Sequence, residues 1–245
     1  MISRCLICCI MSLTLVILSC SDQTDIPQTP EAYEGLVAAH TAGVISRESI
    51  IRIRFTDDMV DSDALYATLP QSPFTFAPDI EGIAVWRDTK TLEFRPSDRL
   101  PSGHVYSASL NLQQIAETSE DTGVFEFSFE GMRQSYEVAI DGLQATDQAD
   151  LTIQELKGNI ITADTENSTI LESVVSATQG GNALPITWEH TGNNQRHIFT
   201  VDNISRGDEA SIVVVSWNGE PIDVDKQGQQ EVTVPAIGAF EVVSA

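Results

Sequence analysis

Positive charge is scarce in this chain of 245 residues, and glycine and proline are not abundant either. Only 13 Lys and Arg accompany 36 Asp and Glu, which gives a formal net charge of −23. Because such a body repels nucleic acid and anionic lipid, the composition excludes electrostatic binding of phosphate polymers. The 15 Gly and 10 Pro are too few for a low-complexity chain, whereas 42% hydrophobic residues are enough to fill a core.

Cysteine is limited to four residues, and three of them, Cys5, Cys8 and Cys9, lie in the first apolar stretch of the chain. Removal of that stretch on export leaves Cys20 alone. One Cys forms no internal disulfide and builds no zinc site. We expect no metal and no cofactor elsewhere in the chain either.

The N-terminal apolar run is short. It follows Arg4, covers residues 5–18 and is interrupted only by hydroxyl side chains, whereas a membrane-spanning helix needs about 20 apolar residues. The pattern is typical of a signal peptide. The sequence Ile17-Leu18-Ser19-Cys20 resembles a bacterial lipobox, in which the Cys is lipidated and becomes the first residue. Cys20 is therefore the predicted lipid attachment site, with a plain signal peptide and an incidental Cys20 as the alternative.

Lipidation would make a membrane the first partner of the protein and the cell envelope its location, with the outer membrane preferred. Residues 1–19 are then the signal peptide. Residues 20–42 carry Pro27 and Pro30 among small and polar side chains without a sustained period. That composition predicts a tether that holds the body away from the membrane.

From Gly43 the pattern changes to short strands. Ile51, Ile53 and Phe55 alternate with Arg52 and Arg54, which is typical of a half-buried strand. Turn residues separate further segments of this kind at 74–76, 84–86, 92–94, 104–112 and 124–129. Short strands at such spacing predict an antiparallel β-sandwich over 43–132.

A second block, 134–245, repeats the theme without a clear register to the first. Strands are expected at 151–163, 173–178, 184–190, 197–202, 211–217, 230–234 and 239–244. Asp164 is expected to cap a short helix that ends at Leu171, with Glu166 in its first turn. Hairpin turns are expected at 179–182 and 218–219. The sequence thus predicts an all-β chain of two consecutive antiparallel sandwiches.

Several stretches carry a family resemblance. Residues 74–78, 92–96 and 100–103 are similar to the bacterial Ig-like module and to the first macroglobulin-like domain of bacterial alpha-2-macroglobulins. Residues 179–190, 197–202 and 214–222 resemble the second domain of such lipoproteins. The resemblance covers nearly all of 40–245 and implies two macroglobulin-like, Ig-like domains.

In that family a large envelope lipoprotein inhibits proteases by trapping them after a bait segment is cleaved, often with help from a thioester. This chain has neither the Cys-Gly-Glu-Gln thioester motif nor a long bait-like segment. The resemblance therefore implies the N-terminal anchoring portion of a trap, which would meet proteases only through the remainder of the molecule. The alternative is an Ig-like surface lipoprotein that binds a glycan or protein ligand. Nucleic acid is not an expected partner.

Three groups of residues invite a sharper interpretation. The acidic run 57–63 lacks the Gly and terminal Glu of a calcium loop. His190 and His197 are placed to meet across a hairpin as a metal pair, but strand alternation puts Glu189 on the opposite face. The three tryptophans are expected in the core rather than on a glycan-stacking surface: Trp86, Trp188 and Trp217.

Catalytic motifs are missing. The sequence contains no Gly-x-Ser-x-Gly, no His-Glu-x-x-His and no glycine-rich phosphate loop. A Ser-His-Asp triad needs only to meet in space, so sequence alone leaves it open. The four His are scattered without a nucleophile signature, and we predict that the chain is not an enzyme.

Overall fold

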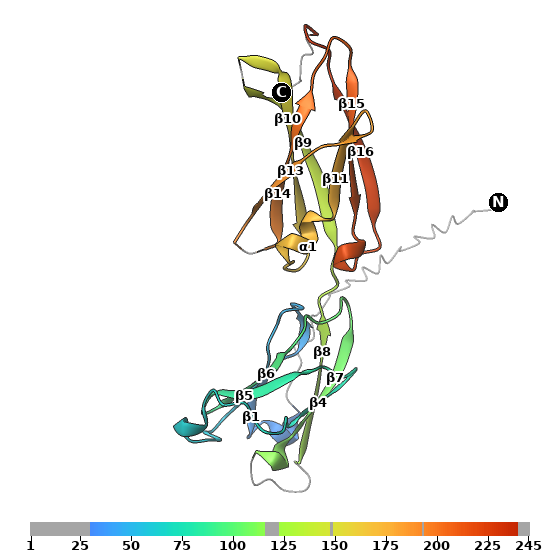
Figure 1. The fold of residues 1–245 in the computed structure, drawn as a ribbon. Coiled ribbons are helices and arrows are strands. Elements are labelled where there is room, and N and C mark those ends of the chain that lie inside the picture. Colours follow the sequence, from blue (N-terminus) through green and yellow to red (C-terminus); the bar gives the residue numbers. More distant parts are fainter. Residues whose placement is uncertain (1–29, 116–122, 148, 193, 240–245) are drawn as a thin grey trace, which may run out of the picture.

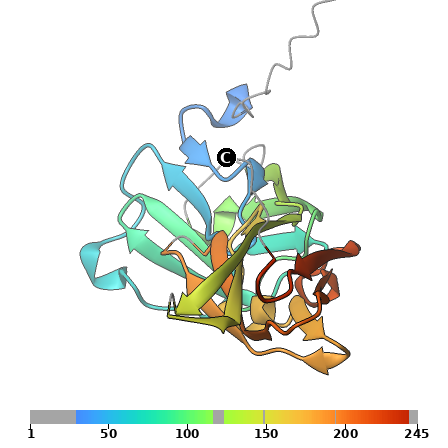
Figure 2. The ribbon, with the colours of Figure 1, turned by 90° about the horizontal axis from the view of Figure 1, so that it is seen from above.

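The computed structural model describes residues 30–115, 123–147, 149–192 and 194–239. They form two β-sandwiches stacked end to end, which gives an elongated molecule (Figure 1). Residues up to Gly131 make the lower domain in this view, and residues from Tyr136 make the upper one. A view along the long axis superimposes the two domains (Figure 2). Within the described residues, no helix is long and apolar enough to cross a membrane.

The first domain packs two four-stranded sheets. One sheet has the order β1 (Val37–His40), β3 (Ile51–Phe55), β6 (Thr91–Pro96), β5 (Gly82–Asp88). The other has the order β2 (Gly43–Ile45), β8 (Val124–Gly131), β7 (Val105–Asn111), β4 (Phe74–Ala77). All neighbours are antiparallel except β2 and β8, which run parallel. This pair departs from the purely antiparallel sandwich that the sequence predicts.

The core of this domain follows the predicted alternation. Strand β3 buries Ile51, Ile53 and Phe55 and turns Arg52 and Arg54 outward, which confirms the half-buried strand. Aromatic rings from both sheets meet in the middle. The large, fully buried side chains include Trp86, Tyr106, Phe55, Phe125, Leu92 and Leu110.

The second domain also has two four-stranded sheets. Their orders are β13 (Ile186–His190), β14 (Arg196–Ser205), β10 (Asp150–Thr162), β9 (Tyr136–Asp147) and β12 (Asn182–Ala183), β11 (Val175–Gln179), β15 (Ser211–Asn218), β16 (Gln227–Val234). All pairs are antiparallel. The core lies between them and includes Leu156, Ile160, Phe199, Val201, Val213 and Val215.

Short helical turns complete both domains: η1 (Glu31–Tyr33), η2 (Ser62–Ala64), η3 (Leu112–Gln114), α1 (Ser168–Glu172) and η5 (Glu220–Ile222). The hairpin turn predicted at 179–182 is confirmed. Gly180 and Gly181 have φ of 57° and 82° between paired Gln179 and Asn182. Two positive φ angles are what a two-residue I′ turn requires, and glycine adopts them without strain.

The predicted tether over 20–42 is wrong in its second half. Strand β1 pairs with β3, and Val37 is 2% exposed within the core. The Tyr33 hydroxyl donates to the carbonyl of Val124 at 2.5 Å. These residues belong to the first sandwich, and β1, with only four residues, is too short to show a period in the sequence. The remaining tether residues up to 29 lie outside the described part of the chain.

The predicted helix cap is also wrong. Helix α1 begins after Asn167, whose side-chain oxygen accepts from the backbone N–H of Ile170 at 3.2 Å. Asp164 and Glu166 precede the helix, and their carboxylates bind residues of the first domain instead. Competition from these distant partners explains the difference, because a capping rule considers only local backbone groups.

The second block differs from the sequence expectation at one strand and one turn, and one expected strand lies almost wholly outside the described residues. Strand β9 was not expected. The turn at 218–219 is not tight, because β15 and β16 are joined by a loop over 219–226 that contains η5. The strand expected at 239–244 lies, apart from Ala239, outside the described residues.

Candidate functional site

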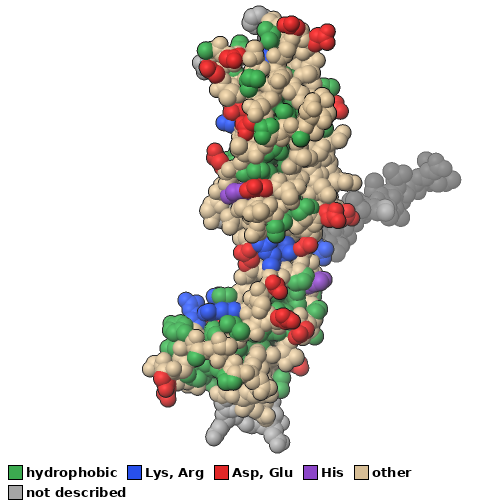
Figure 3. Space-filling view, viewed as in Figure 1, with side chains coloured by type: hydrophobic (Ala, Val, Ile, Leu, Met, Phe, Trp, Pro, Cys, Tyr) green, Lys and Arg blue, Asp and Glu red, His purple; other side chains and the backbone are tan. Residues whose placement is uncertain are grey.

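The predicted lipid attachment site, Cys20, lies outside the described residues. The described body holds two charged clusters. Viewed from one side, Lys and Arg side chains gather at the waist between the domains and on the shoulder of the lower domain above β5 and β6 (Figure 3). We call the first the domain junction (Arg47, Glu48, Arg99, Gln134, Asp164, Glu166, Asp223) and the second the arginine face (Arg52, Arg54, Arg87, Glu93, Arg95).

Arg47 is the centre of the domain junction. It lies in the loop between β2 and β3 and is 5% exposed. Its Nε donates to the carbonyl of Leu100 in its own domain at 2.8 Å. Its Nη2 reaches Asp223 Oδ2 of the second domain at 2.6 Å, and its backbone N–H donates to Asp164 Oδ2 at 2.6 Å. One residue thus connects the first domain to two carboxylates of the second.

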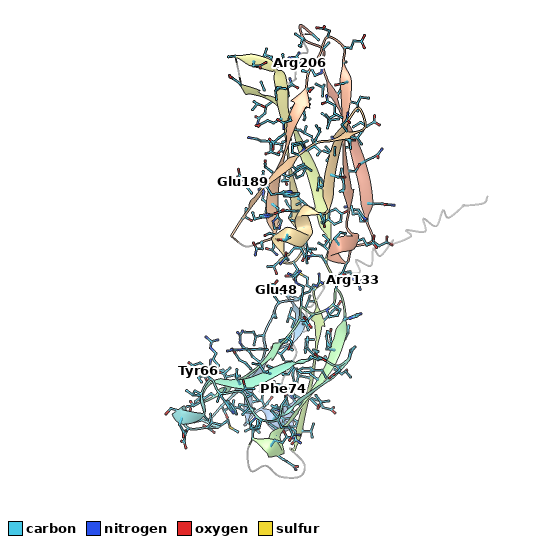
Figure 4. The ribbon with its side chains drawn as sticks, viewed as in Figure 1. Glu48, Tyr66, Phe74, Arg133, Glu189 and Arg206 are labelled. Atoms are coloured by element: carbon cyan, nitrogen blue, oxygen red, sulfur yellow. The ribbon has the colours of Figure 1, made fainter. Side chains whose placement is uncertain are left out.

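Arg99 makes a second ionic link. Its guanidinium binds Glu166 of the second domain and Glu48 of its own, the latter at 2.6 Å. Burial acts to lower the pKa of Arg99, but hydrogen bonds from its guanidinium to Glu48 and Glu166 outweigh burial and raise it. Glu166, 2% exposed, also lies 3.7 Å from Arg47 Nη1. Glu48 and Arg133, both labelled in Figure 4, lie on this waist.

Gln134, in the peptide that connects the domains, forms hydrogen bonds to both of them. Its Nε2 donates to Glu166 Oε2 at 3.0 Å, and its Oε1 accepts from the backbone N–H of Asp164 at 3.0 Å. Its own backbone N–H donates to Ser102 Oγ of the first domain at 2.8 Å. Because Gln134 is 4% exposed, its polar groups depend on these partners rather than on water.

The arginine face is built around one buried carboxylate. Glu93 on β6 is 2% exposed on its side chain. Arg52 Nε lies 2.8 Å from its Oε1, Arg95 Nη2 lies 2.9 Å from its Oε2, and Arg87 Nη1 lies 3.7 Å from Oε1. Burial acts to raise the pKa of Glu93, but the hydrogen bonds from Arg52 and Arg95 overcome it and hold that pKa below its ordinary value. Glu93 therefore stays ionised at neutral pH.

A groove of about 450 Å³ opens beside this cluster. Arg52, Arg54 and Arg87 line it together with Asp88, His40 and Thr41. The register explains the arrangement, because Arg52 pairs with Glu93 and Arg54 with Thr91 across β3 and β6. Outward positions of three strands are thereby brought to one surface.

His190 and His197 do meet across their hairpin, as expected. They are register partners, and their Nδ1 atoms lie 2.7 Å apart, so one ring donates and the other accepts. Burial and the neighbouring His190 lower the pKa of His197. Glu172 of α1 lies 3.0 Å from His190 Nε2, and Glu166 acts electrostatically on His197, whereas Glu189 is exposed. In the described part of the chain, no three His, Cys, Asp or Glu side chains are placed to hold a metal ion.

The other candidates, the three tryptophans and the acidic run 57–63, contribute to packing and hydrogen bonding within the fold. Trp86 is 2% exposed in the first core, and Trp188 and Trp217 pack partly buried against the second. Within the acidic run, Asp58 accepts from the hydroxyl of Thr89 at 2.5 Å. The sequence did not single out Glu93 or Gln134, although the outward Arg52 and Arg54 were a signal for the arginine face.

Comparison with known proteins finds no matching family model and no matching curated protein. Similar solved structures include an L,D-transpeptidase from Mycobacterium tuberculosis H37Rv, an enzyme, with 11% identity, a TM-score of 0.29 and coverage of 65% of this chain and 61% of that one. A titin fragment has 8% identity, a TM-score of 0.27 and coverage of 80% and 94%. A structure of the Down Syndrome Cell Adhesion Molecule has 13% identity, a TM-score of 0.22 and coverage of 80% and 26%. None of these three is a macroglobulin.

Proposed function

We propose that this chain is the membrane-proximal, non-catalytic portion of an alpha-2-macroglobulin-like envelope lipoprotein that traps proteases. Cys20 anchors it, and the two sandwiches form a stiff spacer that presents the rest of the molecule. The domain junction supports the spacer. There Arg47 of the first domain is only 5% exposed and is held by Glu166 and Asp223 of the second domain.

Stiffness follows from the energetics of such contacts. Neighbouring domains usually move relative to each other unless their interface prevents it. Separation of these domains would strip Arg47 and Glu166 of their partners. Bending at the junction would also break the hydrogen bonds that Gln134 makes to both domains, and a connected polar network of this kind resists disruption more than a single pair does. A spacer that transmits position rather than bending suits an anchored molecule that closes around a protease.

Small-angle X-ray scattering tests the spacer. We expect the wild-type body to give one elongated shape, and Arg47→Gln with Glu166→Gln to give a broader range of dimensions. Lys157→Gln is the matched control, because Lys157 is 47% exposed in the middle of β10 and its ion pair is with Glu155, which is not part of the junction. A wild-type protein that already bends as freely as the double variant contradicts the spacer.

The anchor and the trap have their own tests. Incorporation of labelled palmitate is expected in the wild type and lost in Cys20→Ser. An antibody against the second sandwich is expected to detect, in cells that make the protein, a band far heavier than 26.7 kDa. A single band at that mass would remove the support for a trap and leave an independent lipoprotein.

A second candidate function is a surface lipoprotein that binds a glycan through one sandwich. The observation that favours it is the arginine face, whose guanidiniums are about half exposed although the chain as a whole is acidic. The two candidates are compatible, since a spacer can also carry a ligand.

A further inference from the structure

The arginine face concentrates cations in a chain that has few. Four of its 13 Lys and Arg residues lie on this one sheet surface: Arg52, Arg54, Arg87 and Arg95. The acidic side chains among them are Glu93 and Asp88. The local charge is therefore positive, against −23 for the whole chain.

Glu93 does not neutralise this surface but organises it. Its buried carboxylate binds Arg52 through Nε and Arg95 through Nε and Nη2. These guanidiniums are nevertheless 45% and 44% exposed on their side chains, and Arg87 is 57% exposed. Side chains held in place by a buried partner lose little conformational entropy when a ligand arrives. Arg52, which also lines the groove, is thus preorganised for an anion.

The residues that line the groove beside the cluster indicate which class of ligand fits there. Its lining combines Arg54 and Arg87 with the hydroxyl of Thr41 and the carboxylate of Asp88, and Ala39 is its single apolar side chain. Guanidinium forks bind carboxylates in pairs of parallel hydrogen bonds. A carboxylate such as Asp88 accepts hydrogen bonds from neutral hydroxyl groups. A ligand that carries both carboxylates and hydroxyls matches this lining.

We propose that the arginine face and its groove bind an acidic saccharide, an inference that rests on the second candidate function above. Uronate carboxylates bind Arg52, Arg54 and Arg87, and sugar hydroxyls bind Asp88. A protein partner fits less well, because interfaces between proteins have an apolar, aromatic-rich centre that this groove lacks. A long polyanion fits less well too. The acidic remainder of the body repels it, whereas a short saccharide experiences the local charge within a Debye length of about 8 Å.

The residue spacing supports a short, extended ligand. Arg52 and Arg54 occupy alternate positions of β3, which separates them by about 7 Å along the strand. Arg87 extends the positive surface on β5, two strands away in the order β3, β6, β5. Carboxylates on successive sugar units would therefore find successive guanidiniums.

Calorimetric titration of the wild-type body with a short oligogalacturonate tests the site. We expect binding that weakens with added salt, and about tenfold weaker binding for each of Arg54→Gln and Arg87→Gln. Lys157→Gln, which removes the same charge from the second domain, is expected to bind as the wild type does. A neutral galactose oligomer and a short polyglutamate serve as ligand controls.

Binding of oligogalacturonate that both arginine variants weaken and the Lys157 variant does not supports the site. Equal loss in all three variants indicates attraction by overall charge and overturns it. Binding of polyglutamate in preference to the saccharide overturns the saccharide and assigns the face to an acidic peptide. Absence of binding by either acidic probe overturns the proposal, and circular dichroism verifies that each variant is folded.

Discussion

The domain junction and the arginine face use the same chemical device to different ends. In each, a carboxylate whose side chain is 2% exposed, Glu166 or Glu93, is held by guanidiniums. At the junction Arg47 and Arg99 are 5% and 21% exposed, and acidic groups outnumber them. On the face the three arginines that pair with Glu93 are 44–57% exposed, and the arginines outnumber the acids. Burial and charge balance, rather than residue type, decide whether such a cluster locks the fold or remains open to a ligand.

The largest effect should come from Glu166→Gln. This change leaves Arg47 and Arg99 without their shared carboxylate inside a buried junction, and we expect a loss of about 3 kcal/mol in the free energy of unfolding. Urea denaturation measures it. Glu48→Gln is the comparison, because Glu48 binds the same Arg99 but is 54% exposed; its loss should stay within about 1 kcal/mol. Equal losses would show that burial does not distinguish the two partners.

Glu93→Gln, on the arginine face, should lower the free energy of unfolding by less than Glu166→Gln does. Its arginines can turn to water, so we expect a loss of about 2 kcal/mol. The pKa of Glu93 is lowered in the folded protein, so its stabilisation is present above the ordinary value of 4.5 and is lost as pH falls through the lower folded pKa. Unfolding followed between pH 6 and about pH 3 should show the wild type losing more stability than the variant. Parallel curves would contradict an ionised, stabilising Glu93.

The buried pair of His190 and His197 in the second domain is a third cluster, and its effect on stability should depend on pH. Its pKa is lowered from 6.5 in the folded state because it is buried beside His190. The unfolded state therefore binds more protons as pH falls below 6.5, and stability should decline there by at most about 1.4 kcal/mol per pH unit. The decline should disappear in His197→Gln. It should persist in His104→Gln, which alters an exposed histidine. Persistence in both variants would assign the decline to other groups.

Local pattern predicted much of the fold but not the clusters. The alternation at 51–55 correctly predicted that Arg52 and Arg54 point outward. It could not reveal Glu93, because a strand's own pattern does not say which residues lie opposite on the next strand. Local pattern places Asp164 and Glu166 at a helix start, whereas their partners Arg47 and Arg99 are 117 and 67 residues away. The net charge did not predict the arginine face either, because it adds these arginines to the many acidic residues of the rest of the chain.

The smallest effect on stability should come from Arg87→Gln, and that is what makes it informative. Arg87 is 57% exposed and lies 3.7 Å from Glu93, so solvent screens the pair, and the free energy of unfolding should change by less than about 0.5 kcal/mol. The same variant should weaken binding of an acidic saccharide. A residue that contributes little to the fold but much to an anion's affinity is what separates a binding surface from a structural ion-pair network. A large loss of stability in this variant would instead make the arginine face a second lock, equivalent to the domain junction.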